Sequence, residues 1–218
     1  MNRRKLAVAG ILVAVAAAFA AGAVVYQRKT REATDAKAAT ESSRLVRMHS
    51  PVLGPVDAPV TVVEFFDPAC ESCRAFYPYV KELMARHPRD VRVVLRYAPL
   101  HPGSDVVIKL LEAAKRQGKY VPVLEAVLEA QPQWANHARP QPTLAFDVAR
   151  GVGLDMERAT ADMQRPEMQA LLQQDVDDLK ALQVKGTPTF FVNGRSLPSF
   201  GPDQLAALVA EEAAKAKR

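Results

Sequence analysis

Residues 64–73 read EFFDPACESC, and this stretch decides the fold because it sets the only two cysteines of the chain, Cys70 and Cys73, directly after an apolar run. Two cysteines scattered at random over a chain of this length would stand three positions apart roughly one time in a hundred. The spacing therefore predicts a redox-active thiol pair. An inert structural pair and a metal-binding pair are the alternatives.

The segments on either side of the cysteines predict a strand, a helix and a second strand. APVTVVEFF (58–66) and VRVVLRY (91–97) are rich in β-branched and aromatic residues, which is typical of buried strands. Residues 70–87 carry apolar side chains at helical spacing between them. A strand, helix and strand within about forty residues indicate a parallel pair with a right-handed crossover, and so an α/β fold.

The rest of the chain predicts a long helical insertion and a return to the sheet. Residues from about 103 to 183 contain several helical runs and no strand-like run. Residues 189–192 then predict a strand, Asn193-Gly194 a two-residue turn, and residues 195–197 the returning strand. Pro202 opens a last helix that ends near Lys215. One folded domain is thus expected over residues 51–218.

The position of the two cysteines predicts different chemistry for each. A thiolate is the nucleophile of disulfide exchange, and the start of a helix stabilises an anion through unpaired backbone N–H groups and the helix dipole. Cys70 is therefore expected to be the attacking thiol. Cys73, one turn later, is placed to resolve the mixed disulfide. Glu71 would oppose the negative charge on Cys70, so we expect a moderate oxidant whose potential is tuned by Glu71 and Ser72.

These motifs resemble the thioredoxin superfamily, and within it the DsbA-like group of exported thiol-disulfide oxidoreductases, over residues 51–215. The resemblance rests on the cysteine motif with an acid six residues before it, on a proline eight residues after the first cysteine, on the helical insertion, and on two further segments. These features are Glu64, Cys70, Cys73, Pro78, Pro99-Leu100-His101-Pro102 and VKGTPTFFVNG at 184–194.

The resemblance implies a thioredoxin fold and a protein thiol-disulfide oxidoreductase that uses no cofactor. It also implies that Thr187-Pro188 is a cis peptide that docks substrate backbone beside the cysteines. Glu64 lies where the family keeps a buried acid, and desolvation there would raise its pKa and suit it to relay protons to Cys73. The alternative for Glu64 is an ordinary strand residue that faces solvent.

The expected partners follow from the same resemblance. The Cys70-Cys73 disulfide would be donated to reduced exported proteins, and a DsbB-like membrane partner would reoxidise the pair. Two departures leave the redox direction open, because Glu71-Ser72 replaces the Pro-His of strongly oxidising relatives and Thr187 replaces their valine. A reductase or isomerase on the same fold, and a module that binds copper through the two thiolates, are the alternatives.

The N-terminal region predicts export. Residues 6–26 hold no charged side chain and follow Arg3, Arg4 and Lys5. A helix of that length, at about 1.5 Å per residue, matches the hydrocarbon core of a bilayer, which favours an uncleaved signal anchor over a long signal peptide cleaved after Ala20 or Ala23. Residues 27–50 are polar and predict a linker. The domain would face the periplasm, either anchored to the inner membrane or soluble after cleavage.

The charge distribution argues against nucleic acid as a partner. The net charge of +5 arises in residues 1–50, which hold nine basic and three acidic side chains. The remaining residues hold twenty basic and twenty-one acidic side chains. The folded domain therefore lacks the basic excess that binding to a phosphate backbone requires.

The other polar residues give weaker signals. The four histidines show no metal-ligand spacing, so no metal site is predicted, and His101 is the one expected to pack near the active-site face. Asp175, Asp177 and Asp178 resemble a carboxylate cluster, but two of them share the solvent face of one helix, so all three are expected to be solvated and to bind no cation. The histidines are His49, His87, His101 and His137.

Overall fold

The computed structural model describes Lys29 and residues 42–217. Within Arg44–Arg218 the described residues form one compact unit, which begins before Pro51 and so inside the predicted linker. The predicted anchor or signal segment at residues 6–26 lies outside the described residues. None of the helices in the described part is both long and apolar enough to cross a bilayer.

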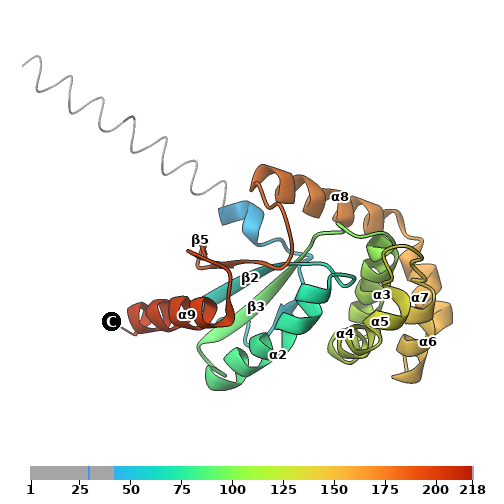
Figure 1. The fold of residues 1–218 in the computed structure, drawn as a ribbon, viewed down its shortest axis with the longest axis horizontal. Coiled ribbons are helices and arrows are strands. Elements are labelled where there is room, and N and C mark those ends of the chain that lie inside the picture. The colour runs from blue at the N-terminus through green and yellow to red at the C-terminus, as the bar shows by residue number, and fades with distance from the viewer. Residues whose placement is uncertain (1–28, 30–41, 218) are drawn as a thin grey trace, which may run out of the picture. The chain divides into compact units, whose positions relative to one another are not determined.

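A five-stranded mixed sheet forms the centre of the unit, in the order β1-β3-β2-β4-β5 (Figure 1). β2 and β3 are parallel and all other neighbours are antiparallel, which confirms the predicted α/β fold and its parallel pair. Only β1 was not predicted, because two residues give no periodicity. The strands are β1 (Val52–Leu53), β2 (Val60–Phe66), β3 (Val91–Tyr97), β4 (Thr189–Val192) and β5 (Arg195–Ser196).

Helix α2 (Glu71–Arg86) joins β2 to β3 and packs on one face of the sheet beside α9 (Pro202–Ala216), as Figure 1 shows. Its buried stripe is Cys73, Phe76, Val80 and Leu83. These positions recur every three or four residues, so they lie on one side of the helix and bury it against the strands. The helix begins one residue after Cys70, which is its N-cap.

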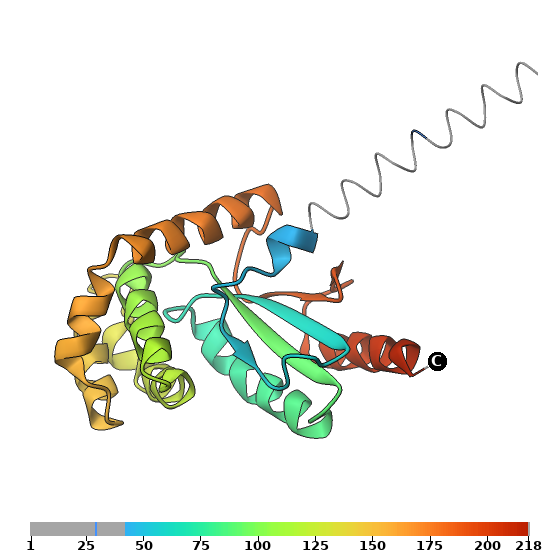
Figure 2. The same ribbon diagram turned by 180° about the vertical axis from the view of Figure 1, so that it is seen from behind.

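The predicted insertion consists of helices. Figure 2 shows most of them grouped at one end of the sheet, while α8 runs back toward the strands. α8 contacts β3, and its Leu179 packs in a small apolar cluster with Val63, Phe65 and Val94. The helices are α3 (Ser104–Arg116), α4 (Tyr120–Glu129), α5 (Gln131–Trp134), α6 (Leu144–Gly151), α7 (Met156–Met163) and α8 (Pro166–Ala181).

Alternation along β2 positions the acid of the active-site motif. Val62 and Phe66 belong to the main core under α2, whereas Val63 and Phe65 belong to the cluster with α8. Because successive side chains of a strand point to opposite faces, Glu64 shares the face of Val62 and Phe66. The carboxyl group therefore points toward the helix that carries the cysteines.

The prediction for the aspartates of α8 was wrong for two of them. Asp175 and Asp178 are buried, because Arg96 of β3 reaches both carboxylates with Nη2, at 2.7 and 2.8 Å. Arg47 binds Asp178 through two hydrogen bonds of 2.7 Å, and His49 lies 2.7 Å from Asp175. Charges buried in this way must be paired, and this cluster joins residues just before β1 to β3 and α8.

Candidate active site

Cys70 lies where the start of α2 meets the loop before β4. Its Sγ atom lies 3.3 Å from the backbone carbonyl oxygen of Thr187, which only the protonated thiol can donate to. The Thr187-Pro188 peptide is cis, which confirms that part of the prediction. Two segments that are far apart in the sequence thus form one surface around the Cys70 sulfur.

The surroundings of Cys70 favour its thiolate and lower its pKa to about 5. The largest cause is a hydrogen bond from the Cys73 thiol, which outweighs the opposing effect of burial. The side chain of Thr187 and the backbone N–H groups of Cys73 and Ser72 lower the pKa further. Unpaired N–H groups in the first turn of α2 therefore act on this sulfur as its N-cap position predicts.

Cys73 has the opposite character. Its side chain is fully buried, and burial, the hydrogen bond to Cys70 and the charge of Glu64 raise its pKa far above that of a free thiol. Both cysteines are free and lie 3.8 Å apart. One member of the pair is thus held as a thiolate and the other as a thiol, with the thiol donating to the thiolate.

Glu64 is only 2% exposed, which excludes the alternative of a solvent-facing side chain. Burial raises the pKa of its carboxyl group to about 8, and the negative charge of Cys70 adds to the effect. Since the charge of Glu64 in turn raises the pKa of Cys73, the carboxyl group is close enough to the buried thiol to influence its protonation. Near neutral pH, Glu64 can therefore both hold and release a proton beneath the thiols.

Asp67 organises the corner between β2 and the cysteines, and the sequence analysis did not single it out. Its buried carboxylate accepts hydrogen bonds from the backbone N–H groups of Ala69, Leu100 and His101, at 2.9 to 3.0 Å, and from the hydroxyl of Ser104. The PLHP segment after β3 is thereby fixed against the active-site loop. Its position in DPAC, between a strand and the cysteine motif, is the only local signal for this role.

Gln131 was also missed, because it comes from the insertion. Its Nε2 donates to the backbone carbonyl oxygens of Pro68 and Cys70, at 2.8 and 2.9 Å. Its Oε1 accepts a hydrogen bond of 2.9 Å from Nε of Arg74. One buried amide thus ties α5 to the active-site loop and to α2, and no sequence pattern marks it.

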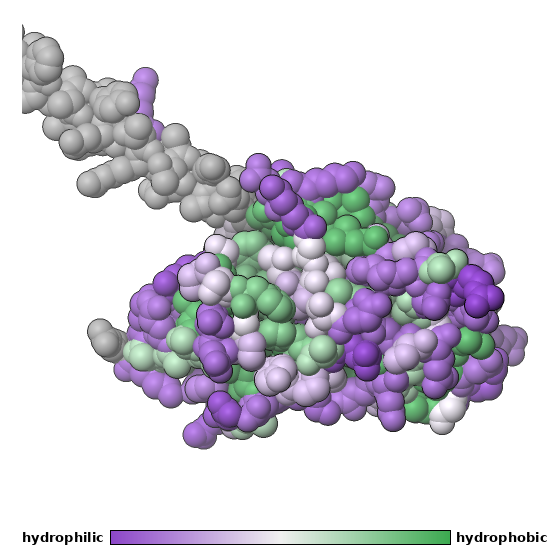
Figure 3. Space-filling model, in the orientation of Figure 1, coloured by the Kyte–Doolittle hydropathy of each residue, from purple (hydrophilic) through white to green (hydrophobic). Residues whose placement is uncertain are grey.

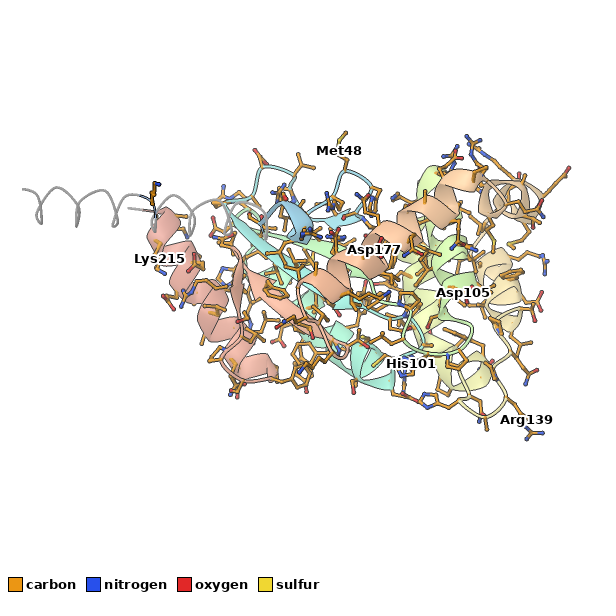
Figure 4. The ribbon with its side chains drawn as sticks, turned by 90° about the horizontal axis from the view of Figure 1, so that it is seen from above. Met48, His101, Asp105, Arg139, Asp177 and Lys215 are labelled. Carbon is orange, nitrogen blue, oxygen red and sulfur yellow. The ribbon has the colours of Figure 1, made fainter. Side chains whose placement is uncertain are left out.

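Glu71, Ser72 and His101 lie around the mouth of the site. The Glu71 carboxylate is largely exposed and lies 3.1 Å from Nε2 of His137. His101, labelled in Figure 4, lies in the loop after β3, near the active-site face as expected. Its Nδ1 lies 2.7 Å from Oδ2 of Asp67. Burial alone would lower the pKa of His101, but the bond to Asp67 and the charges of Asp67, Cys70 and Glu71 raise it.

A groove of about 460 Å³ runs beside the cysteines. Figure 3 shows apolar and weakly polar residues gathered in the middle of this face of the molecule, next to hydrophilic ones. Phe200 is 60% exposed there. The groove is lined by Ser72, Gly186, Thr187, Pro188, Thr189, Phe190, Ser196, Leu197 and Phe200.

Comparisons with solved structures agree with this fold. A thioredoxin-like oxidoreductase from Silicibacter pomeroyi DSS-3 is 34% identical, with a TM-score of 0.68, over 79% of this chain and 97% of the other. BdbD from Bacillus subtilis is 25% identical, with a TM-score of 0.67, over 76% and 94%. The catalytic domain of Proteus mirabilis ScsC has a TM-score of 0.68 at 20% identity, a likeness of fold alone, over 82% and 98%.

Curated sequence relatives include much longer proteins. The Na(+)/H(+) antiporter NhaA 3 of Salinispora tropica is 36% identical over 73% of this chain, and the NhaA of Herminiimonas arsenicoxydans is 35% identical over 67%. The chain spans only 24% and 22% of their lengths. The family model described as Thioredoxin matches residues 47–211. The chain therefore belongs to the thioredoxin superfamily, in its DsbA-like group of thiol-disulfide oxidoreductases.

Proposed function

We propose that the chain exchanges disulfides with proteins through Cys70 and Cys73, and that it acts as an oxidant outside the cytoplasm. The observation that carries this proposal is the contrast between the two thiols. The pKa of Cys70 is lowered to about 5 while that of the buried Cys73 is raised. A stabilised thiolate is a good leaving group, and stabilising the reduced form makes a disulfide more oxidising.

The exchange proceeds in two balanced steps. A substrate thiolate attacks Sγ of Cys70 in the Cys70-Cys73 disulfide, which forms a mixed disulfide and releases Cys73 as a thiolate. A second substrate thiolate then attacks the substrate sulfur of the mixed disulfide and releases Cys70 as a thiolate. The substrate dithiol is oxidised by two electrons and the enzyme disulfide is reduced by two.

Glu64 is proposed to supply the proton that the first step needs. Cys73 leaves as a thiolate but is strongly favoured as a thiol in its buried position. With a pKa of about 8, the Glu64 carboxyl group is mostly protonated at neutral pH and can transfer its proton to Cys73. It regains a proton from solvent afterwards, so the residue acts as a relay.

The groove beside Cys70 is proposed to hold an extended segment of the substrate protein. Thr187 and Pro188 line it and also border the Cys70 sulfur. The backbone N–H and C=O groups next to a proline stay free to pair with an extended peptide that adds as a strand. Pairing of this kind uses main-chain hydrogen bonds, so it binds peptides irrespective of their sequence. Exposed Phe200 would add apolar contact without strict specificity.

The location and the recycling partner are part of the same proposal. Stable oxidation of a protein disulfide requires an oxidising compartment, and the charge-free segment at residues 6–26 supports export. A DsbB-like membrane partner would accept the electrons from reduced Cys70 and Cys73. Whether the segment anchors the domain in the inner membrane or is cleaved is decided by the mass of the N-terminus in membrane and soluble fractions.

Equilibration of the full chain with glutathione buffers tests the direction of exchange. An oxidant should have a potential between about −120 and −180 mV, the range from DsbA to protein disulfide isomerase. A potential near −270 mV, that of thioredoxin, would identify a reductase instead. A competent oxidant that also reshuffles wrongly paired disulfides would favour the isomerase alternative.

The order of attack is tested by trapping. Cys73→Ala leaves Cys70 able to form mixed disulfides but unable to resolve them, so this variant should accumulate covalent complexes with protein substrates. Cys70→Ala should accumulate none, since the remaining thiol is buried. Trapping by Cys70→Ala alone would reverse the assignment.

A further inference from the structure

Three side chains that can ligate a metal ion meet at the mouth of the active site. Glu71 comes from the first turn of α2, His101 from the loop between β3 and α3, and His137 from the loop after α5. One ligand atom of each lies within 4.8 Å of the others. The centroids of the two imidazole rings are 5.0 Å apart.

A second observation concerns the orientation of His101. Its Nδ1 lies 2.7 Å from Oδ2 of Asp67, whose carboxylate is buried and already accepts backbone N–H groups on both sides of the corner. A carboxylate can only accept from the ring, so Nδ1 carries a hydrogen, and in the neutral imidazole, the form that binds metals, Nε2 keeps its lone pair. Histidines that bind metals are held in the same way, by a carboxylate on the other ring nitrogen.

We propose that Glu71, His101 and His137 form a binding site for a divalent transition-metal ion of the zinc type. Two imidazole nitrogens and one carboxylate oxygen suit Zn²⁺ and its neighbours, whereas Mg²⁺ and Ca²⁺ prefer sites built from oxygen alone. Three protein ligands leave a fourth position open for water or for a substrate group. The two thiols are not part of the site, which separates it from a copper site made of Cys70 and Cys73.

The geometry allows the ligands to close around an ion. Zinc–ligand bonds of about 2.0–2.2 Å place the donor atoms of a tetrahedral site roughly 3.4 Å apart. Oε1 of Glu71 and Nε2 of His137 already lie 3.1 Å apart. Their side chains are 60% and 55% exposed, so an ion can reach them from solvent and both can rotate, while the bond to Asp67 holds His101 in place.

The test uses the full chain in its oxidised form, because a Cys70-Cys73 disulfide offers no thiolate to the metal. The protein is freed of metal with a chelator and titrated with Zn²⁺ against a chromogenic competitor. One equivalent should bind. His137→Ala and Glu71→Gln should each weaken binding by at least about tenfold, the effect of losing even an outer-shell partner.

His87→Ala is the matched control, since this histidine caps the far end of α2 and should leave zinc binding unchanged. The proposal fails if the oxidised chain binds no zinc, or if His137→Ala and Glu71→Gln bind it as tightly as the native chain. It also fails if Mg²⁺ binds as well as Zn²⁺. Binding that appears only after reduction, and is lost in Cys70→Ala, would assign the metal to the thiolates instead.

Discussion

The Sγ atom of Cys70 lies 3.3 Å from the carbonyl oxygen of Thr187, although 117 positions separate the two residues in the sequence. The contact joins the start of the first helix of the thioredoxin core to the loop that enters β4. Thr187 therefore contacts the reactive sulfur and also lines the groove that would hold a substrate. Changes to either segment should be detectable in the chemistry of the thiol.

The acidity of Cys70 should depend on Cys73. In metal-free buffer, the ultraviolet absorbance of the thiolate should titrate with a pKa of about 5, so the thiolate is present above that pH and lost below it. Cys73→Ala removes the hydrogen bond that is the largest cause of this shift, so the pKa of Cys70 should rise toward the free value of about 8.5. It should remain lower than that because the backbone N–H groups of α2 persist.

Ser72→Ala is the control for this titration. Only the backbone N–H of Ser72 acts on the Cys70 sulfur, so the pKa should not change. An unchanged pKa in Cys73→Ala would contradict the assignment of the hydrogen bond.

Glu64→Gln should change how the stability of the protein depends on pH. Folding raises the pKa of Glu64 from about 4.5 to about 8, so between these pH values the carboxyl group ionises in the unfolded chain but stays protonated in the native one. The native state therefore loses stability relative to the unfolded state as the pH rises through this window. The free energy of unfolding of the variant, relative to that of the native chain, should increase by about 3 kcal/mol between pH 4 and pH 7. Denaturant unfolding at the two pH values measures it, and parallel pH profiles would show that Glu64 is not the titrating group.

The same variant should slow the proton transfer at Cys73. An amide cannot exchange the proton, so the release of Cys73 from its disulfide should be about 100-fold slower near neutral pH. Stopped-flow measurement of the first exchange step reports this rate. The alkylation rate of the Cys70 thiolate serves as the internal control and should change little, and a full rate of release in Glu64→Gln would rule out the relay.

Phe200→Ser should raise the KM for protein substrates and leave exchange with small thiols unchanged. Phe200 is exposed in the groove, and covering an aromatic side chain of this kind contributes about 1.5 kcal/mol or more, which corresponds to about tenfold in KM. Exchange with glutathione should not change, because the tripeptide is too short to cover the groove. Val56→Ser removes an apolar side chain that is more exposed than Phe200 and lies outside the groove, so it should have no effect. An equal loss in both variants would argue against the groove.

Arg96→Met should destabilise the fold strongly. The change leaves the buried carboxylates of Asp175 and Asp178 without their shared cation, at a cost of about 3–5 kcal/mol in the free energy of unfolding. Burial alone would raise the pKa of Asp178, but its bonds to Arg47 and Arg96 lower it. The stability that the ionised carboxylate contributes is therefore present above about pH 4 and is lost as the pH falls below it. Arg92→Met, on the same strand but only half-buried, is the control and should cost about 1 kcal/mol at most.

Local patterns predicted the site residues that are close in sequence, and the family resemblance added Thr187-Pro188, but neither identified His137 or Gln131 as part of the site. The cysteines and Glu64 lie within one strand–helix junction, whose periodicity places them. His137 and Gln131 reach the same site from the insertion, at distances that no spacing rule covers. Their roles depend on how the insertion packs.

The error over Asp175 and Asp178 has a similar cause. Acidic residues three apart on a helix are typical of a solvent face. The partner that makes their burial possible, Arg96, lies in a separate strand. An arginine inside the apolar run VRVVLRY was the one available sign, since a charge in a central strand needs a buried counter-charge.

The amide of Gln131 has a consequence for how this protein can change over evolutionary time. Because it binds the carbonyl oxygens of Pro68 and Cys70 and also the side chain of Arg74, α5 and the cysteine motif cannot be exchanged independently between relatives. Grafting a foreign insertion that lacks the amide would leave the carbonyl oxygen of Pro68 without its donor, while that of Cys70 would keep only the bond from the backbone N–H of Arg74. The insertion and the thiol pair are therefore expected to be inherited as one unit.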